Sequence, residues 1–145
     1  WYYEVSREGS KFNMNDLSAS IGRVQLKRFK SLMSKKNSLI RYYIKKIQSI
    51  NFSLLLPYNI QNNSYWIMGL RHKKRDLLIN HLNKNNISTG VHYLPLSKHP
   101  LYKKYDKNLK VSNNVWQEIL TLPLHTGMSK KDIDRIVHCL NNFQK

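Results

Sequence analysis

The chain has 145 residues, which is enough for one domain with its own hydrophobic core. Its 25 lysines and arginines outnumber its 8 acidic residues, and the formal net charge of +17 favours an anionic partner: nucleic acid, a membrane surface or a phosphate-bearing ligand. The single cysteine, Cys139, excludes an internal disulfide and is typical of the reducing cytoplasm, where we expect the protein to act. No apolar run approaches the ~20 residues of a membrane span and no signal peptide is visible, so we expect no membrane span.

The basic residues are scattered in pairs and triplets along the chain, and lysines outnumber arginines 18 to 7. Surfaces that bind phosphate favour the arginine fork. The composition therefore indicates solvated faces, and a nucleic-acid-binding surface is the alternative.

Residues 9–26 predict a turn followed by the start of a helix. Gly9 suits a sharp change of direction, because glycine adopts backbone angles that other residues avoid. Asn13 and Asn15 offer side-chain oxygens to the first helical amides, and Asp16 suits the positive end of the helix dipole.

The helix that follows has a face of small residues. Leu17, Ile21 and Val24 recur at helical spacing, and Ala19 and Gly22 fall three residues apart on one face. A glycine inside a helix costs about 1 kcal/mol relative to alanine, so we expect close packing there. The helix packs either on its own domain or on a part outside this chain.

Apolar residues continue at helical spacing and predict helix over 16–50, divided into two helices end to end by a weak point at 34–37. The stripe consists of Phe29, Leu32, Leu39, Ile40, Tyr43, Ile47 and Ile50. One straight helix of this length would measure about 50 Å, so it must kink or project along a partner. We therefore assign residues 1–50 to a turn and a long helical arm.

Residues 51–145 alternate between predicted strands and helices. Pro57 and the polar run 61–64 mark a loop, and Pro95 and Pro100 hold a second, irregular loop. We expect strands at 65–70, 87–93 and 120–122, the last of them stopped by Pro123.

Three further helices are predicted in this part. The first covers 74–84 and turns Leu77, Leu78 and Leu82 inward. The second is short, is capped by Ser112 and carries Val115 and Ile119. The third is capped by Ser129, with Asp132 three residues on and an apolar face of Ile133, Ile136, Val137, Leu140 and Phe143.

The resulting fold class is α/β (α+β): a long N-terminal helical arm, then a small three- to four-stranded sheet with flanking helices. The six histidines, at 72, 81, 92, 99, 125 and 138, include no pair with the close spacing of a helical zinc motif, so we expect no metal site.

Three blocks of sequence, in this order, resemble the DegT/StrS-type sugar aminotransferases, which are pyridoxal-phosphate (PLP) enzymes of fold-type I. The first contains Trp1-Tyr2-Tyr3, Gly9, Lys11-Phe12-Asn13-Met14-Asn15-Asp16-Leu17, Ala19, Ile21-Gly22 and Gln25-Leu26. The second contains Gly90, His92-Tyr93, Pro95-Leu96, Pro100 and Tyr102, and the third Leu122-Pro123-Leu124-His125, Gly127-Met128-Ser129, Asp132 and Asp134. The first block departs from the common pattern, since Lys11, Asn13, Ser18 and Ser20 stand where many members have Asn, Arg, Gln and Ala.

The resemblance implies that residues 51–145 are the C-terminal small domain of such an enzyme and that residues 1–50 form its interdomain and dimer contact. The large PLP domain, with the Schiff-base lysine, is absent from this chain, so we expect no catalytic residue here. The chain begins with Trp1 and not with methionine, which indicates a piece of a longer protein. We expect the fragment alone to bind little cofactor.

The resemblance also implies a set of binding residues. Lys11 and Asn13 would contact the phosphate of the neighbouring subunit's PLP, with helix capping as the alternative role for Asn13. His92 and Tyr93 would border the sugar-nucleotide pocket, with a structural, hydrogen-bonded histidine as the alternative.

The complete protein would be a homodimeric aminotransferase. Its substrates would be glutamate and a nucleotide-linked keto-sugar, and it would serve cell-surface polysaccharide or glycoconjugate synthesis. Two alternatives from other classes stay open, a small basic nucleic-acid-binding protein and a non-catalytic interaction domain.

Overall fold

The computed structural model describes residues 2, 4, 6–47, 52–55, 63–105, 107 and 109–143. It divides into two compact units, 1–31 and 32–145, and each is considered by itself. Pro57 and residues 61 and 62 of the expected first loop lie outside the described residues.

The first unit contains an extended segment and the start of helix α1 (Asp16–Lys46). The Asn15 side-chain oxygen accepts the amide hydrogen of Ser18 at 2.8 Å, so Asn15 is the residue that caps α1. Gly9 has no positive φ, so the conformational freedom expected of it is not used. Leu17, Ile21 and Val24 are exposed.

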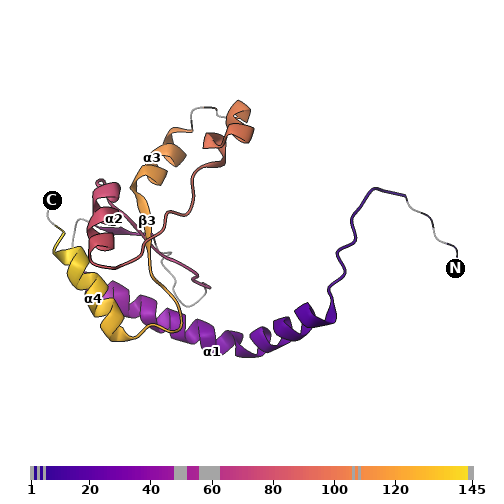
Figure 1. Cartoon of the computed structure of the whole chain (residues 1–145), viewed down its shortest axis with the longest axis horizontal. Coiled ribbons are helices and arrows are strands. Elements are labelled where there is room, and N and C mark those ends of the chain that lie inside the picture. The colour runs from indigo at the N-terminus through magenta and orange to yellow at the C-terminus, as the bar shows by residue number, and fades with distance from the viewer. Residues whose placement is uncertain are drawn as a thin grey trace. The chain divides into compact units, whose positions relative to one another are not determined.

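Helix α1 corrects two expectations (Figure 1). It is a single helix, not two, and it ends at Lys46 instead of near residue 50; residues 48–50 lie outside the described part of the chain. The polar run 34–37 contains neither proline nor glycine, so it weakens the helix only slightly. The next turns bury Leu39, Ile40 and Tyr43 in the core of the second unit, and this packing favours helix through the polar run.

The sheet has three antiparallel strands in the order β1-β2-β3. They are β1 (Ser53–Leu54), β2 (Met68–Arg71) and β3 (Ile119–Leu122). Met68 pairs with Leu122 and Arg71 with Ile119. The predicted strand 120–122 is confirmed with one added residue, and the strand predicted at 65–70 begins three residues late.

The strand predicted at 87–93 is wrong. Only Gly90 pairs, in an isolated antiparallel bridge with Thr121 of β3. After this bridge the His92 side chain reaches back to Thr121, so the chain leaves the edge of β3 after one residue.

Helices α2 (Arg75–Lys84), α3 (Lys110–Glu118) and α4 (Lys130–Asn141) confirm the three expected helices, with corrections inside two of them. Leu78 and Leu82 are buried in α2, but Leu77 is exposed. Ser112 lies within α3 and does not cap it, and Ile119 belongs to β3. The irregular loop contains two 3-10 helices, η1 (Leu96–Lys98) and η2 (Pro100–Tyr105).

The start of α4 is as the sequence predicts. The Ser129 hydroxyl accepts the amide hydrogen of Asp132, and the Asp132 carboxylate accepts the amide hydrogen of Ser129 at 2.7 Å. The hydrogen bond from the Ser129 amide, and a second one of 2.8 Å from the Ser129 hydroxyl to the same carboxylate, lower the pKa of Asp132 below its ordinary value. The capping box is therefore complete.

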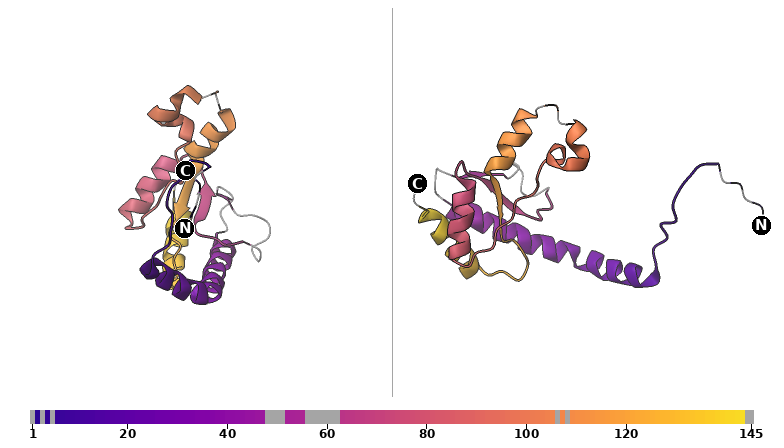
Figure 2. Two further views of the ribbon diagram at one scale, coloured as in Figure 1. Left: turned by 90° about the vertical axis from the view of Figure 1, so that its right-hand side faces the viewer. Right: turned by 45° about the horizontal axis from the view of Figure 1, so that its top comes forward.

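The core of the second unit lies between the sheet, the C-terminal half of α1, α2 and α4, which gather together in Figures 1 and 2. Its fully buried side chains include Ile40, Tyr43, Met68, Leu70, Leu78, Leu82, Leu120, Ile133 and Leu140. Arg75 is also buried, and its guanidinium donates to the carbonyl oxygens of Trp116 (3.3 Å) and Ile119 (3.1 Å). A buried arginine needs such partners, and here it joins α2 to the α3–β3 junction.

Two adjacent tyrosines attach α1 to the rest of the second unit. The Tyr43 hydroxyl is buried and donates to the Pro123 carbonyl oxygen at 3.0 Å, and burial raises the Tyr43 pKa above its usual value. The Tyr42 hydroxyl donates to the Asp134 carboxylate at 2.9 Å, which lowers the pKa of Asp134. Lys46 adds an exposed ion pair with Asp134 at 3.2 Å.

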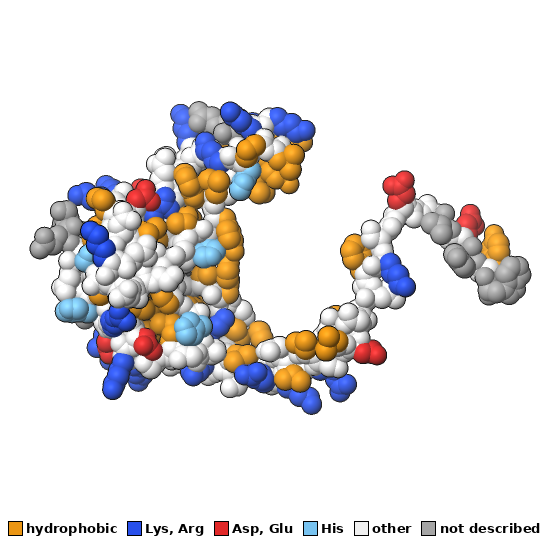
Figure 3. Space-filling model, in the orientation of Figure 1, with side chains coloured by type: hydrophobic (Ala, Val, Ile, Leu, Met, Phe, Trp, Pro, Cys, Tyr) orange, Lys and Arg blue, Asp and Glu red, His pale blue; other side chains and the backbone are white. Residues whose placement is uncertain are grey.

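Large apolar side chains are exposed over residues 96–111 of the second unit, the upper lobe in Figure 3, with Lys and Arg side chains beside them. They are Leu96, Leu101, Tyr102, Tyr105, Leu109 and Val111. None of the described helices is both long enough and apolar enough to cross a membrane.

We predict that Tyr43→Phe lowers the free energy of unfolding of the 145-residue chain by about 1–2 kcal/mol, because it leaves the Pro123 carbonyl without its buried donor. Tyr42→Phe is the matched control and removes a hydroxyl that bonds to an exposed carboxylate. We expect a smaller loss there. Urea unfolding followed by circular dichroism measures both, and equal losses would contradict the role assigned to the Tyr43 hydroxyl.

Candidate functional site

The predicted phosphate-binding residues lie in the extended segment that precedes α1. Lys11 and Asn13 are exposed, and neither side chain makes a hydrogen bond or ion pair within the part of the chain that the structure describes. Because Asn15 caps the helix, the Asn13 amide stays available for another acceptor. The capping alternative for Asn13 is therefore wrong.

The donor chemistry of this segment fits a phosphate. Lys11 offers an ammonium and Asn13 two amide hydrogens, and both donate to anionic oxygens. Beyond the phosphate, these two side chains offer nothing that would hold a pyridine ring. The segment therefore fits part of a PLP site and leaves the rest of that site to other residues.

The second predicted pair, His92 and Tyr93, belongs to a cluster of three aromatic side chains in the second unit. Trp66 completes it, and we call the three residues the aromatic corner. The His92 ring stands edge-on to Tyr93 (4.7 Å between centroids) and to Trp66 (5.4 Å), and the Trp66 and Tyr93 rings are near parallel at 6.2 Å. Trp66 and Tyr93 are 55% and 65% exposed, so the corner presents apolar ring surface to solvent.

His92 is held from behind by β3. Its Nδ1 lies 2.9 Å from the Thr121 hydroxyl oxygen, whereas Nε2 has no partner among the described residues. The hydrogen bond at Nδ1 is the one that the structural alternative expects, while the binding role of His92 stays a prediction.

Gly90 makes this arrangement possible. It exchanges two backbone hydrogen bonds with Thr121, at 3.1 and 2.7 Å, and so sits directly beneath the His92 ring. A Cβ atom at Gly90 would lie 2.6 Å from His92 Cε1 and 3.0 Å from the Thr121 hydroxyl oxygen. Any larger residue at Gly90 must displace the imidazole.

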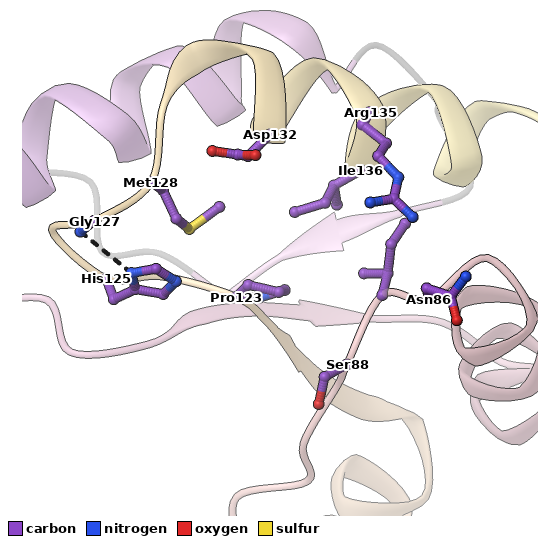
Figure 4. A pocket seen from close by; sticks show the side chains of 10 residues that line it. Asn86, Ser88, Pro123, His125, Gly127, Met128, Asp132, Arg135 and Ile136 are labelled. Atoms are coloured by element: carbon purple, nitrogen blue, oxygen red, sulfur yellow. Dashed lines mark hydrogen bonds between the residues drawn. The ribbon is translucent and has the colours of Figure 1, made fainter.

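A separate hollow of about 370 Å³ lies between the start of α4, the loop after β3 and residues 86–88 (Figure 4). Three of its polar or charged side chains are already engaged. The Asp132 carboxylate closes the capping box, Arg135 donates to the Asn85 carbonyl at 2.6 Å, and His125 Nδ1 accepts the Gly127 amide hydrogen at 3.2 Å. His125 is therefore a turn residue in this structure.

Sequence reasoning missed two members of the site around His92. The sequence places Trp66 and Thr121 only within the expected strands 65–70 and 120–122, whereas Trp66 is exposed and both side chains contact His92. A usable signal exists for Thr121, because a hydroxyl between Leu120 and Leu122 in a buried strand requires a hydrogen-bond partner. Among the described residues, no three His, Cys, Asp or Glu side chains gather as metal ligands would.

Comparison with known proteins gives one consistent result. A model of the DegT/DnrJ/EryC1/StrS aminotransferase family matches residues 2–141. The "Spore coat polysaccharide biosynthesis protein SpsC" of Bacillus subtilis (strain 168) is 30% identical over 158 aligned positions, which cover 100% of this chain and 40% of that protein. The chain thus spans about 40% of the length of this curated relative.

Solved structures agree. A putative sugar aminotransferase, Spr1654 from Streptococcus pneumoniae, in its PMP-form is 28% identical with a TM-score of 0.84, over 96% of this chain and 37% of that one. The same protein is known in a PLP-form, and PLP is accordingly the cofactor of the family. The sugar aminotransferase CalS13 from Micromonospora echinospora has a TM-score of 0.89 at 18% identity, over 98% of this chain and 39% of that one, and shows the likeness of fold alone.

Proposed function

The chain belongs to the DegT/DnrJ/EryC1/StrS aminotransferase family, and from this premise we propose that it is the C-terminal part of a PLP-dependent sugar aminotransferase. The complete enzyme moves an amino group from glutamate to a nucleotide-linked keto-sugar. The match over residues 2–141 carries this proposal, and the relative SpsC, a spore coat polysaccharide biosynthesis protein, supports a role in cell-surface polysaccharide or glycoconjugate synthesis. Glutamate and nucleotide sugars are cytoplasmic metabolites, so we place the enzyme in the cytoplasm.

PLP, when bound, supplies the electron sink for amino transfer. This chain contributes contacts around the cofactor and not the reacting lysine, which we assign to the large domain. Lys11 and Asn13 donate to the phosphate of the PLP held by the neighbouring subunit. Their exposure and freedom from other bonds support this assignment.

His92 and Tyr93 bind the sugar nucleotide. The exposed face of Tyr93 offers apolar surface to a ring of the substrate, and the unpartnered Nε2 of His92 offers a hydrogen-bonding atom beside it. The role is binding and orientation, since the amino-transfer chemistry belongs to the cofactor.

The N-terminal arm, residues 1–50, contacts the large domain and the second subunit of a homodimer. In its described part, Leu17, Ile21 and Val24 expose a stripe of apolar surface along α1. A Cβ atom added at Gly22 would meet no described atom within 4 Å outside the adjoining backbone of α1, so the glycine serves no packing purpose among the described residues. Gly22 lies on a different face of the helix from this apolar stripe, and a mid-helix glycine there supports close packing of a second face against a part outside this chain.

We predict that the complete protein with PLP releases about one equivalent of 2-oxoglutarate per subunit from glutamate when no sugar is present, and releases it continuously once a UDP- or dTDP-linked keto-sugar accepts the amino group. The 145-residue chain alone should release none and retain no cofactor absorbance band. A stoichiometric PLP band on the isolated chain would contradict the proposed division of roles. Sub-micromolar binding of DNA or RNA with a steep salt dependence would instead support the basic nucleic-acid-binding alternative.

Loss of the phosphate donors tests the cofactor contact. In the complete protein, Lys11→Met and Asn13→Ala should each raise the dissociation constant for PLP roughly tenfold or more, as expected for a lost charge-assisted hydrogen bond. Lys30→Met, which removes a second exposed lysine of the same unit, is the control. Fluorescence titration of the apoenzyme with PLP gives the constants, and equal affinities for all variants would remove Lys11 and Asn13 from the site.

Gly22→Ala tests whether the helical arm packs against a part outside this chain. It should have opposite effects on stability in the 145-residue chain and in the complete protein. In the 145-residue chain, where the new methyl group meets open space, it should stabilise α1 by about 1 kcal/mol. In the complete protein it should lower the melting temperature, because the methyl group enters a packed contact. Ser20→Ala, on the opposite side of the same helix, should not lower it. Stabilisation by Gly22→Ala in both settings would show that this face is not packed.

A further inference from the structure

Thr121 occupies a position in β3 that has no structural need for a hydroxyl. Its neighbours Leu120 and Leu122 are buried apolar residues, and Thr121 itself is only 7% exposed. Its backbone is fixed on both sides, by the register with Gly69 of β2 and by the bridge to Gly90. Valine would fill the same space without a polar atom, and a buried hydroxyl costs free energy unless it forms a hydrogen bond.

Among the described residues the hydroxyl has one hydrogen-bond partner, Nδ1 of His92 at 2.9 Å. If the hydroxyl accepted a proton from Nδ1, its own hydrogen would remain unsatisfied in a buried place. If it donates to Nδ1, both groups are satisfied. The Thr121 hydroxyl therefore donates to Nδ1 of His92, and the hydrogen of the neutral imidazole lies on Nε2.

Two further contacts limit the ring. The space beneath it is filled by the Gly90 backbone, where a Cβ atom would come within 2.6 Å of Cε1. The Trp66 ring stands edge-on at 5.4 Å. The imidazole is thus held in one plane, with Nε2 as the nitrogen left for a ligand.

We propose that Thr121 is a positioning residue, which fixes the ring plane of His92 and keeps its hydrogen on Nε2, so that His92 donates to an acceptor oxygen of the substrate. The acceptor class is a phosphate oxygen of the nucleotide-linked sugar. This use of the Nε2 hydrogen rests on the proposed function, whereas the orientation of the ring does not.

Nitrogen NMR of the complete protein labelled with 15N-histidine, at a pH about two units above the ordinary histidine pKa, tests the orientation directly. The His92 signals, assigned by their loss in His92→Asn, should show hydrogen on Nε2 and a hydrogen-bonded Nδ1. Thr121→Val should shift the Nδ1 signal towards that of a free imidazole, and Thr121→Ser should keep it. A hydrogen on Nδ1 in the unmodified protein, or signals unchanged by Thr121→Val, would overturn the inference.

Gly90→Ala provides a second route that keeps the hydroxyl but displaces the ring, and it should shift the same signal. Circular dichroism of each variant shows whether the fold is retained.

Calorimetric titration with UDP and with dTDP, each as a separate probe, addresses the function. Thr121→Val should weaken binding roughly fivefold to tenfold, as for one lost hydrogen bond, and should have no further effect in a His92→Ala background. Unchanged binding in His92→Ala would refute the substrate role of His92, while the NMR result still decides the positioning by Thr121.

Discussion

The placement of strand β3 is the constraint on which the rest of the second unit depends. One edge of the strand pairs with β2 along its whole length, and the other edge meets Gly90. The carbonyl at its start accepts the buried Arg75, and the carbonyl just past its end accepts the buried Tyr43 hydroxyl. Since buried backbone groups must be paired, each neighbouring segment takes its position from a hydrogen bond that this strand requires.

The same strand connects stability to the candidate site. The Thr121 backbone forms the bridge to Gly90, and its hydroxyl forms a hydrogen bond with His92. The position of the aromatic corner is therefore fixed by the sheet. A ligand-binding loop is ordinarily the mobile part of a domain. Here His92 is attached to the rigid core through Thr121, two residues after the backbone pairing at Gly90, and this attachment provides the preorganisation that the proposed binding role requires.

The described residues of the first unit show no comparable constraint. The described part of α1 within it exposes Leu17, Ile21 and Val24, and its cap is a single side-chain hydrogen bond from Asn15. Helices in water derive most of their stability from tertiary packing of an apolar face. The exposed stripe lies next in the sequence to Lys11 and Asn13, whose side chains form no bond among the described residues, and this supports the proposal that both face a large domain and its cofactor.

Much of the local structure was decided by the sequence itself. The cap at Ser129 with Asp132, the helix spacing of Leu78 and Leu82, and the strand before Pro123 all depend on residues within one or two turns of each other. The motif blocks also identified the family, since they need only the order and type of residues. Such features are local, and local features can be predicted from the sequence without knowledge of the fold.

Only the tertiary structure decided the features that join distant residues. The 34–37 segment stays helical because Leu39, Ile40 and Tyr43 beyond it are buried, and the segment 87–93 is not a strand because His92 bonds to a residue 29 positions away. Trp66 and Thr121 entered the site for the same reason. The spacing of residues along the chain does not show which distant side chains come into contact. Those contacts are fixed by how the core packs around β3.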